Sequence, residues 1–574
     1  MRAILLRTVL WAALAAGTGL SRPALAFPLI DPSNLGSSGA LSDLAAPDAQ
    51  DLSHQLQIAN GLAGAGSAFG WIFQPRLGLQ ESLTDNILQA HSPMRWDLTT
   101  SVSPGIAIVG NTSRAQVRFD YAPVLIINAR TGTQNALNQQ LNGTATVTVI
   151  DEFAFIDLRA LSGIQSTRGA AGAGGTVGAS DSGGLTAGSG GGLGGTSLLG
   201  TRQQDTVQTV SVGISPYLLK KFGEYGTLRL GYSLNMSQSS PAAGFQFSPF
   251  PTGGGSQKQT TTEQTMEFRS GDILNDFQDV LSASLSQSTA SGQLSAFGSA
   301  GSIAAPQAIS STRQILSNQV NYALTRALTL SVSIGHEKIA YGGSNALNID
   351  GATWSFGGTL TPNQTSSITF SYGHQQGSTS LSFNGRYQLT ARTTITGTYS
   401  DTLGTQLENL QRQLGQGSVG ANGSFVNSQT GGQLFGNTNA AAIQPGVFHF
   451  KTLSATIATQ LNRDTLSATL NTSNQVSAGG TAAAQASSQT NGIIMQWTHE
   501  LRPDLRWTTS ASYNVISGGP LGASQSIAIN TSLLYTLSES LSGSARYTYF
   551  RSASSSALRN LYEDIFVLGV TKTF

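Results

Sequence analysis

The chain has 574 residues, of which 39% are hydrophobic and 10% are charged, and its formal net charge is +1. Ordinary soluble domains carry about 25% charged residues. This chain has fewer charged residues and more neutral polar residues and glycine. A net charge near zero excludes an electrostatic surface for nucleic acid, and the absence of cysteine excludes disulfides, thiolate metal sites and a cysteine nucleophile.

Residues 1–26 are predicted to be a cleaved secretory signal. Arg2 and Arg7 form a positive start, a mostly apolar stretch follows, and Ala24 and Ala26 make a small-x-small cleavage site. A transmembrane anchor is disfavoured because the apolar run is too short to span a bilayer and is interrupted by Pro23. We therefore expect export and cleavage after Ala26.

Residues 27–70 combine several aspartates with apolar residues near helical spacing, namely Leu52, Leu56, Ile58 and Leu62. Two interpretations stay open: a periplasmic N-terminal extension, or a small segment that lies in the lumen of the domain that follows. A loosely ordered linker fits the composition equally well.

From Trp71 to Phe574 apolar and polar residues alternate with a period of two, which is the pattern of β-strands. The segments run for about 9–13 residues, which is longer than most soluble strands and matches a tilted membrane crossing. After the signal, no stretch approaches the roughly 18–20 apolar residues of a membrane helix. We assign residues 71–574 to an all-β fold, a transmembrane antiparallel up-and-down β-barrel.

Short turns and longer loops alternate along this barrel region. The short turns are polar and lie near residues 326, 362, 392, 463, 503 and 540, whereas Gly/Ser/Asn-rich connections lie around 336–350, 401–446, 472–488, 514–523 and 551–560. This side bias indicates short periplasmic turns and long extracellular loops. Counting hairpins back from the C-terminus gives about 22 strands, within roughly 20–24, with both termini on the periplasmic side.

Several features interrupt the alternation. Residues 167–200 are rich in glycine and are predicted to form an external loop. Pro75, Pro104, Pro123 and Pro216 fall inside apparent strands, where they should mark strand ends or bulges because proline has no N–H to donate. Residues 402–415 carry leucines at helical spacing, which predicts a short helix in an external loop or folded into the mouth of the barrel.

The last strand carries the most specific motif. Phe566, Leu568, Val570 and Phe574 share one face, and the chain stops on an aromatic residue. This pattern resembles the C-terminal signal of outer-membrane barrels, which implies that the barrel-assembly machinery reads these four residues.

In the first strands, charged residues lie at the alternate positions that carry polar side chains. This face should point to the lumen, because an arginine near the membrane midplane costs about 2–4 kcal/mol on the lipid side. The lumen-facing candidates are Arg76, Arg95, Asp97, Arg118, Asp120, Asp157, Arg159, Arg229, Glu267 and Arg269. They are interpreted as ion pairs that brace a wide barrel, or alternatively as a charged constriction or a dock for a plug.

Nothing in the sequence predicts catalysis. The six histidines show no metal-ligand spacing, and the glycine-rich runs lack the residues of a phosphate loop. We expect no enzyme activity, no cofactor and no metal.

The opening strands resemble a known family. The motif residues are Thr84, Asp85 and Asn86 after an aromatic strand, then Ser103, Pro104 and Gly105, followed by Arg118–Tyr121. They resemble the outer-membrane β-barrel family that is associated with PEP-CTERM and exopolysaccharide gene clusters. The resemblance implies an outer-membrane barrel with a link to polysaccharide secretion, and it brings no catalytic residues.

Together these features predict a barrel in the outer membrane of a Gram-negative bacterium, porin-like in acting as a channel or export conduit, with a link to exopolysaccharide secretion. A structural or surface-anchoring barrel that conducts nothing is the first alternative. A TonB-dependent transporter is the second, disfavoured because the N-terminal region lacks a plug-sized domain. The expected partners are outer-membrane lipid and lipopolysaccharide, the barrel-assembly machinery and polysaccharide-secretion components, but no nucleic acid.

Overall fold

The computed structural model describes residues 70–88, 93–166, 206–241, 257–271, 276–292, 309–342, 346–415, 417–419, 425–427, 446–478, 487–518, 523–554 and 560–574. The predictions for the signal 1–26, for the segment 27–69 and for the glycine-rich insert 167–200 lie outside these residues. In the described part of the chain, no helix is both long enough and apolar enough to cross a membrane.

The described elements are mostly long strands. Their bounds are β1 (Gly70–Thr84), β2 (Asp97–Asn111), β3 (Ala115–Tyr121), β4 (Val124–Asn128), β5 (Ala136–Asn138), β6 (Leu141–Ile150), β7 (Ala154–Ser166), β8 (Thr206–Lys221), β9 (Gly226–Pro241), β10 (Gln257–Ser270), β11 (Phe277–Gly292), β12 (Ile309–Ala323), β13 (Leu328–Tyr341), β14 (Leu347–Asn363), β15 (Ser366–Gln375), β16 (Ser378–Thr390), β17 (Thr393–Gly404), α3 (Gln406–Gly415), β18 (Gly417–Val419), β19 (Phe425–Asn427), β20 (Phe448–Gln460), β21 (Asp464–Ser477), β22 (Ser488–Arg502), β23 (Leu505–Gly518), β24 (Ser524–Ser538), β25 (Leu541–Ser554) and β26 (Leu561–Thr573).

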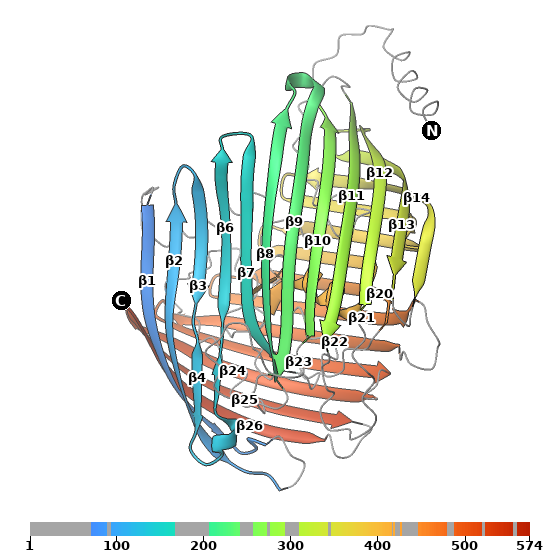
Figure 1. The fold of residues 1–574 in the computed structure, drawn as a ribbon. Coiled ribbons are helices and arrows are strands. Elements are labelled where there is room, and N and C mark those ends of the chain that lie inside the picture. The colour runs from blue at the N-terminus through green and yellow to red at the C-terminus, as the bar shows by residue number, and fades with distance from the viewer. Residues whose placement is uncertain are drawn as a thin grey trace, which may run out of the picture.

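Twenty-four of these segments form a single sheet. β3 and β4 both pair with β2, so they are two parts of one interrupted strand. β6 pairs with β3 and β5 pairs with β4, so β5 and β6 are two parts of the next strand. The described sheet therefore has 24 − 2 = 22 strands. All pair antiparallel with their neighbours, and β1 pairs with β26 to close the barrel (Figure 1). The predicted fold class and strand number are confirmed.

The four prolines lie where strand pairing is interrupted. Pro123 separates β3 from β4, and Pro104 lies on the part of β2 that pairs with neither of them. Pro216 lies in a gap of the β8–β9 pairing, and Pro75 comes just before the first β1 residue that pairs with β26. Because proline cannot donate to a ladder, a closed barrel tolerates it only at such places. The predicted strand end is confirmed for Pro123. For Pro75, Pro104 and Pro216 the prediction of a strand end or bulge is wrong, because they lie inside β1, β2 and β8, each at a place where pairing to one neighbour is missing.

The turns at the two ends of the barrel differ in length, as expected. The short turns near 326, 362, 392, 463, 503 and 540 all occur, and both β1 and β26 have their free ends on this short-turn side. The long connection predicted for 336–350 is wrong, because β13 continues to Tyr341 and β14 begins at Leu347. On the long-loop side, Gln376 and Gly377 alone join β15 to β16, with φ of 55° and 72°, the positive values that a tight hairpin turn requires.

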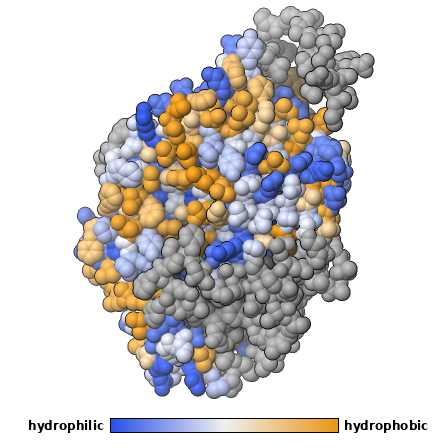
Figure 2. Space-filling model, viewed as in Figure 1, coloured by the Kyte–Doolittle hydropathy of each residue, from blue (hydrophilic) through white to orange (hydrophobic). Residues whose placement is uncertain are grey.

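The outward face of the strands is apolar and the inward face is polar. On β1, Leu77, Leu79 and Leu83 are exposed, while the alternating Gln80 and Ser82 are buried. Figure 2 shows apolar residues over much of the visible wall. A wall that is apolar on one side and neutral polar on the other is what a barrel in a lipid bilayer requires.

Aromatic side chains gather on the outer wall near the short turns. Trp497 and Trp507 lie 5.1 Å apart between ring centroids, and Phe277 and Tyr322 stack at 4.7 Å. The indole N–H of Trp497 donates to Asp464 at 2.8 Å. Such amphipathic rings favour the boundary between lipid and water, so they indicate where the periplasmic interface lies.

Candidate functional site

The strongest charge pair in the lumen joins β1 to β3 across β2. Both guanidinium nitrogens of Arg76 donate to the carboxylate of Asp120 at 2.6 Å. A Cβ at Gly105 would lie 2.9 Å from Arg76 Nε, so glycine leaves the space that this arginine occupies. Arg118 is two residues from Asp120 in the sequence, but the carboxylate of Asp120 accepts its hydrogen bonds from Arg76, which is 44 residues earlier in the chain.

Asp97 and Arg95 have different surroundings. The carboxylate of Asp97 is fully buried and accepts backbone N–H groups of Leu98 at 2.8 Å, Arg130 at 3.0 Å and Thr131 at 2.8 Å. Asp97 therefore fixes the loop between β4 and β5 at the extracellular rim. Arg95 is exposed in the loop before β2, so it does not pair with Asp97.

The other charged candidates lie on β7, β9 and β10. Thr146 Oγ1 donates to Asp157 at 2.8 Å, and Arg159 follows two residues later on the same face of β7. The guanidinium of Arg229 lies 4.6 Å from the ring centroid of Tyr217. Glu267 and Arg269 form an ion pair of 3.1 Å along β10. These contacts are local, and the described residues do not bring the ten candidates together as one ring.

The family-motif residues Thr84, Asp85 and Asn86 lie at the extracellular end of the seam between β1 and β26. Thr84 Oγ1 donates to Glu563 at 2.7 Å, and Asn86 Nδ2 donates to the backbone carbonyl of Tyr562 at 2.8 Å. The backbone N–H of Asp564 in turn donates to Asp85 Oδ1 at 2.9 Å.

These contacts join the first strand to the last across more than 470 residues. The motif therefore stabilises barrel closure. Ser103, Pro104 and Gly105 lie beside the interruption between β3 and β4, where Gly105 makes room for Arg76.

The four residues of the C-terminal motif all point outward. Phe566, Leu568 and Val570 are about half exposed, and Phe574 is 71% exposed. The backbone N–H of Phe574 donates to the carbonyl of Pro75 at 2.9 Å, so the terminal residue ends the seam. Recognition of these residues by the assembly machinery stays a prediction.

The chain after β17 forms the helix predicted for this region, α3. Thr405 caps its N-terminus: Glu408 N–H donates to Thr405 Oγ1 at 3.1 Å, and Thr405 N–H donates to Glu408 Oε2 at 3.0 Å. This reciprocal capping box satisfies two backbone donors that a helix start leaves unpaired. It needs Thr at the cap and Glu three residues later, which the sequence provides.

Side-chain hydrogen bonds hold α3 against the inner wall. Ser311 Oγ donates to Glu408 Oε1 at 2.6 Å, and Tyr341 O–H donates to Glu408 Oε2 at 3.0 Å. Thr261 Oγ1 donates to Gln411 at 2.8 Å. Thr261 and Ser311 have the opposite parity to the exposed Met266 on β10 and to Leu316 and Val320 on β12, so they face inward and α3 lies on the inner side of the wall.

Arg313 extends the same network. Its guanidinium donates to Tyr341 Oη and to the backbone carbonyl of Leu403, both at 3.0 Å. Leu403 is fully buried and packs with Ile339, Tyr341 and Val447. We call the set Ser311, Arg313, Tyr341 and Glu408 the latch, because it fixes α3 and the end of β17 to β12 and β13.

The same connection reaches the other side of the lumen. Gln406 Nε2 donates to Gln475 on β21 at 2.9 Å. The short strands β18 and β19 pair with each other, and β18 contacts β6 and β7. Segments of residues 405–447 therefore contact β21, then β10, β12 and β13, then β6 and β7. Because Thr261, Ser311, Tyr341 and Gln475 lie near the long-loop ends of their strands, α3 lies in the extracellular mouth of the barrel.

Comparison with known proteins gives structural similarity alone. No family model matches the sequence, and no curated protein matches it. Among solved structures, an FrpB iron transporter (F5-1 variant) from Neisseria meningitidis is 12% identical with a TM-score of 0.50, covering 95% of this chain and 89% of that one. The ferric-catecholate import receptor Fiu from E. coli K12 is 9% identical with a TM-score of 0.46, covering 88% and 82%. The siderophore receptor PirA from Acinetobacter baumannii is 10% identical with a TM-score of 0.44, covering 87% and 80%.

The predicted channel or export conduit for exopolysaccharide is wrong. The similar solved structure of FrpB is that of an iron transporter, and α3 lies in the mouth of the described barrel. Barrels of 16–18 strands leave an aqueous channel, whereas 22-stranded transporters have a plugged lumen. The transporter alternative, disfavoured for want of a plug domain, agrees better with these findings.

Proposed function

We propose that the protein is a gated uptake receptor of the outer membrane. Its lumen is closed by its own folded-in chain, and binding of an external ligand is coupled to release of that chain. The observation that carries the proposal is the latch: a part-buried carboxylate, Glu408, accepts hydrogen bonds from two wall residues while it caps α3.

The latch has the properties of a gate that can open. Its contacts to Glu408 are charge-assisted hydrogen bonds, each worth about 1.5–3 kcal/mol, which lie beside the apolar cluster of Ile339, Tyr341, Leu403 and Val447. A ligand can therefore open the gate if it binds the released state more tightly than the closed state by the free energy of these hydrogen bonds. A permanently closed structural barrel would need no such arrangement.

The solved structures suggest the first ligand class to test, a ferric chelate, because they are an iron transporter, a ferric-catecholate import receptor and a siderophore receptor. The TonB-dependent alternative from the sequence adds TonB energy coupling, and the predicted signal adds export to the outer membrane. The ferric ligand, the TonB coupling and the export to the outer membrane are all parts of this proposal.

The test is uptake of radioactive iron, supplied as a catecholate chelate, by iron-starved cells with and without the gene. We expect gene-dependent uptake that is lost in cells lacking TonB. Equal uptake in both strains would contradict the ligand class. Uptake that persists without TonB would contradict the gated mechanism.

A further inference from the structure

The inner wall beside α3 presents two hydroxyl donors and a cation to one carboxylate. Ser311 and Tyr341 lie opposite each other in the pairing of β12 with β13, so their side chains share the inward face. Their hydroxyls donate to the two oxygens of Glu408 at 2.6 Å and 3.0 Å. Arg313, the next inward residue of β12, donates to Tyr341 Oη at 3.0 Å and places a positive charge behind these hydroxyls. Hydroxyl donors backed by a guanidinium are the chemistry that binds an oxyanion.

The pocket next to Glu408 offers further donors. Its charged lining residues in the described chain are Arg313, Arg412 and Glu408, which gives 2 − 1 = +1. Arg313 is 4% exposed and Gln411 is 2% exposed, and the donors Arg313 Nη1 and Gln411 Nε2 have no hydrogen-bond partner among the described residues. The lining also holds an unpartnered acceptor, Gln259 Oε1, and a half-turn of that amide would present a donor instead. An oxyanionic group in this pocket would supply the acceptor that these buried donors lack.

Glu408 is the one carboxylate in this lining, and it belongs to α3. Glu337 on β13 accepts the backbone N–H of Gly377 at 3.2 Å, so it is directed to the turn between β15 and β16. Gly404 leaves space beside the helix, since a Cβ there would lie 2.9 Å from both Arg412 Nη2 and Glu408 Oε2. The Glu408 carboxylate therefore has cations on both the helix side and the wall side.

The site lies where a solute from outside would arrive. Ser311 is near the start of β12, Tyr341 ends β13, and both are at the long-loop end of the barrel. If another oxyanion takes the place of Glu408, the helix loses two wall contacts and the carboxylate that caps the N–H of Thr405. Occupation of the site by an external anion is therefore coupled to loosening of α3.

We infer that Ser311, Arg313 and Tyr341 form a binding site for an oxyanionic group of the external ligand, and that Glu408 occupies this site while the mouth is closed. The inference rests on the proposed gated receptor and names the chemistry that its gate recognises. A ligand bound in place of Glu408 binds only the state in which Glu408 has left, so it shifts the equilibrium toward that state. The site itself is tested without iron, TonB or transport, so its failure is distinguishable from failure of the proposed function.

Chemical rescue of Glu408→Ala tests the site. Acetate carries the carboxylate that this variant lacks. In outer-membrane vesicles, trypsin should cut Glu408→Ala after Arg412 at least about tenfold more slowly in sodium acetate than in sodium chloride of equal ionic strength. Acetamide, which has the same shape without the charge, should give no protection. A denatured substrate in the same buffers corrects for any effect of the salts on trypsin.

Two matched proteins complete the rescue experiment. The parent should be cut equally slowly in both salts, because its own carboxylate is held at a high effective concentration. Glu408→Ala combined with Arg313→Met should show no acetate effect, since the cation behind the hydroxyls is gone. Equal cleavage of Glu408→Ala in acetate and chloride would overturn the inference, and so would equal protection by acetamide.

A second variant keeps the test independent of whether Glu408→Ala assembles. Glu408→Gln retains the size of the side chain and a residue type that suits a capping box. One carboxylate oxygen becomes an amide NH2 group, which cannot accept from Ser311 or Tyr341. We expect cleavage after Arg412 to rise at least about tenfold over the parent. Equal rates for Glu408→Gln and the parent would show that the site does not need an anion and would overturn the inference.

Discussion

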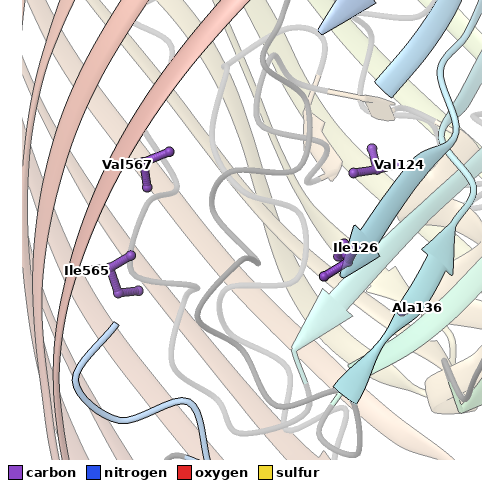
Figure 3. Packing of buried hydrophobic residues seen from close by; sticks show 5 residues of the cluster. All are labelled: Val124, Ile126, Ala136, Ile565 and Val567. Carbon is purple, nitrogen blue, oxygen red and sulfur yellow. The ribbon is translucent and has the colours of Figure 1, made fainter. Parts of the chain in front are cut away.

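The contacts of α3 and the seam of the barrel are held together in different ways. On β10, β12 and β13, hydroxyl and guanidinium groups bind α3 through Glu408, and several of these groups are charged. At the seam, the cluster of Val124, Ile126, Ala136, Ile565 and Val567 is aliphatic (Figure 3), and the buried carboxylates Asp97 and Glu563 lie beyond it toward the extracellular end. Charge-assisted hydrogen bonds are directional and can be exchanged for water, whereas apolar burial is lost only when the surfaces separate. The difference teaches that the hydrogen bonds of Glu408 can be exchanged for water, whereas the aliphatic cluster and the hydrogen bonds between β1 and β26 suit the seam to permanent barrel closure.

The largest effect should follow from a charge at the seam. Ile126→Asp places a carboxylate in a wall that is 6% exposed, and an uncompensated buried charge costs about 3–5 kcal/mol. We expect loss of most of the heat-modifiable folded form in outer membranes. Thr396→Asp, on a part-exposed inner wall, is the control and should fold normally. Equal folding of the two variants would mean that the two walls do not differ.

The latch should show a smaller, local effect. Glu408→Ala removes two wall contacts and the capping box, worth at least about 3 kcal/mol together, which corresponds to a rise of at least roughly 150-fold in the released state. Trypsin added to whole cells should then cut after Arg412, while the parent resists. Glu500→Ala, which removes an exposed ion pair with Arg506 near a short turn, is the control and should leave cleavage unchanged. Resistance of Glu408→Ala would show that other contacts hold α3.

The ion pair between Arg76 and Asp120 should contribute less. Asp120 is 39% exposed, so solvent weakens the pair, and we expect Arg76→Met to lower the unfolding free energy by about 1–2 kcal/mol. Urea unfolding in lipid vesicles measures this change. Combining Arg76→Met with Asp120→Leu should recover part of the loss, since no carboxylate is then left alone. Fully additive losses would argue against coupling between the two residues.

The smallest effect concerns the rim of the seam. Burial raises the pKa of Asp85 above its ordinary value of 3.8, and the nearby Asp564 carboxylate raises it further. An acid with a raised pKa favours the folded state at low pH, and this contribution is lost as the pH rises through the folded-state pKa. Asp85→Asn keeps the acceptor for Asp564 N–H, so it should melt slightly higher than the parent at pH 7 and equally below pH 3.8. A variant that melts lower at pH 7 would contradict this assignment.

Local sequence patterns predicted the strands, their number and the short turns, because each depends on alternation over a dozen residues and on turn composition. The helix near 402–415 was also predicted, since its leucine spacing is local. The place where α3 binds was not, because Ser311 and Glu408 are 97 residues apart and no local pattern links them.

Side-chain partners were harder to predict than strand faces. Parity alone places Arg76, Arg118 and Asp120 on one side of the wall, but partner choice depends on strand register and on the space that Gly105 leaves. Asp97 shows the same difficulty, because its carboxylate binds backbone N–H groups and not the neighbouring arginine. The latch residues Arg313 and Tyr341 were missed altogether. A capping box at Thr405 and Glu408 was the one signal that could have drawn attention to this region.

The central claim is that the lumen is closed by the chain's own segments, and single-channel recording in planar bilayers tests it most directly. The parent protein should give no sustained conductance steps. A variant with residues 405–446 replaced by a short Gly/Ser linker should give large, stable steps. A parent that conducts as well as the shortened variant would contradict the account.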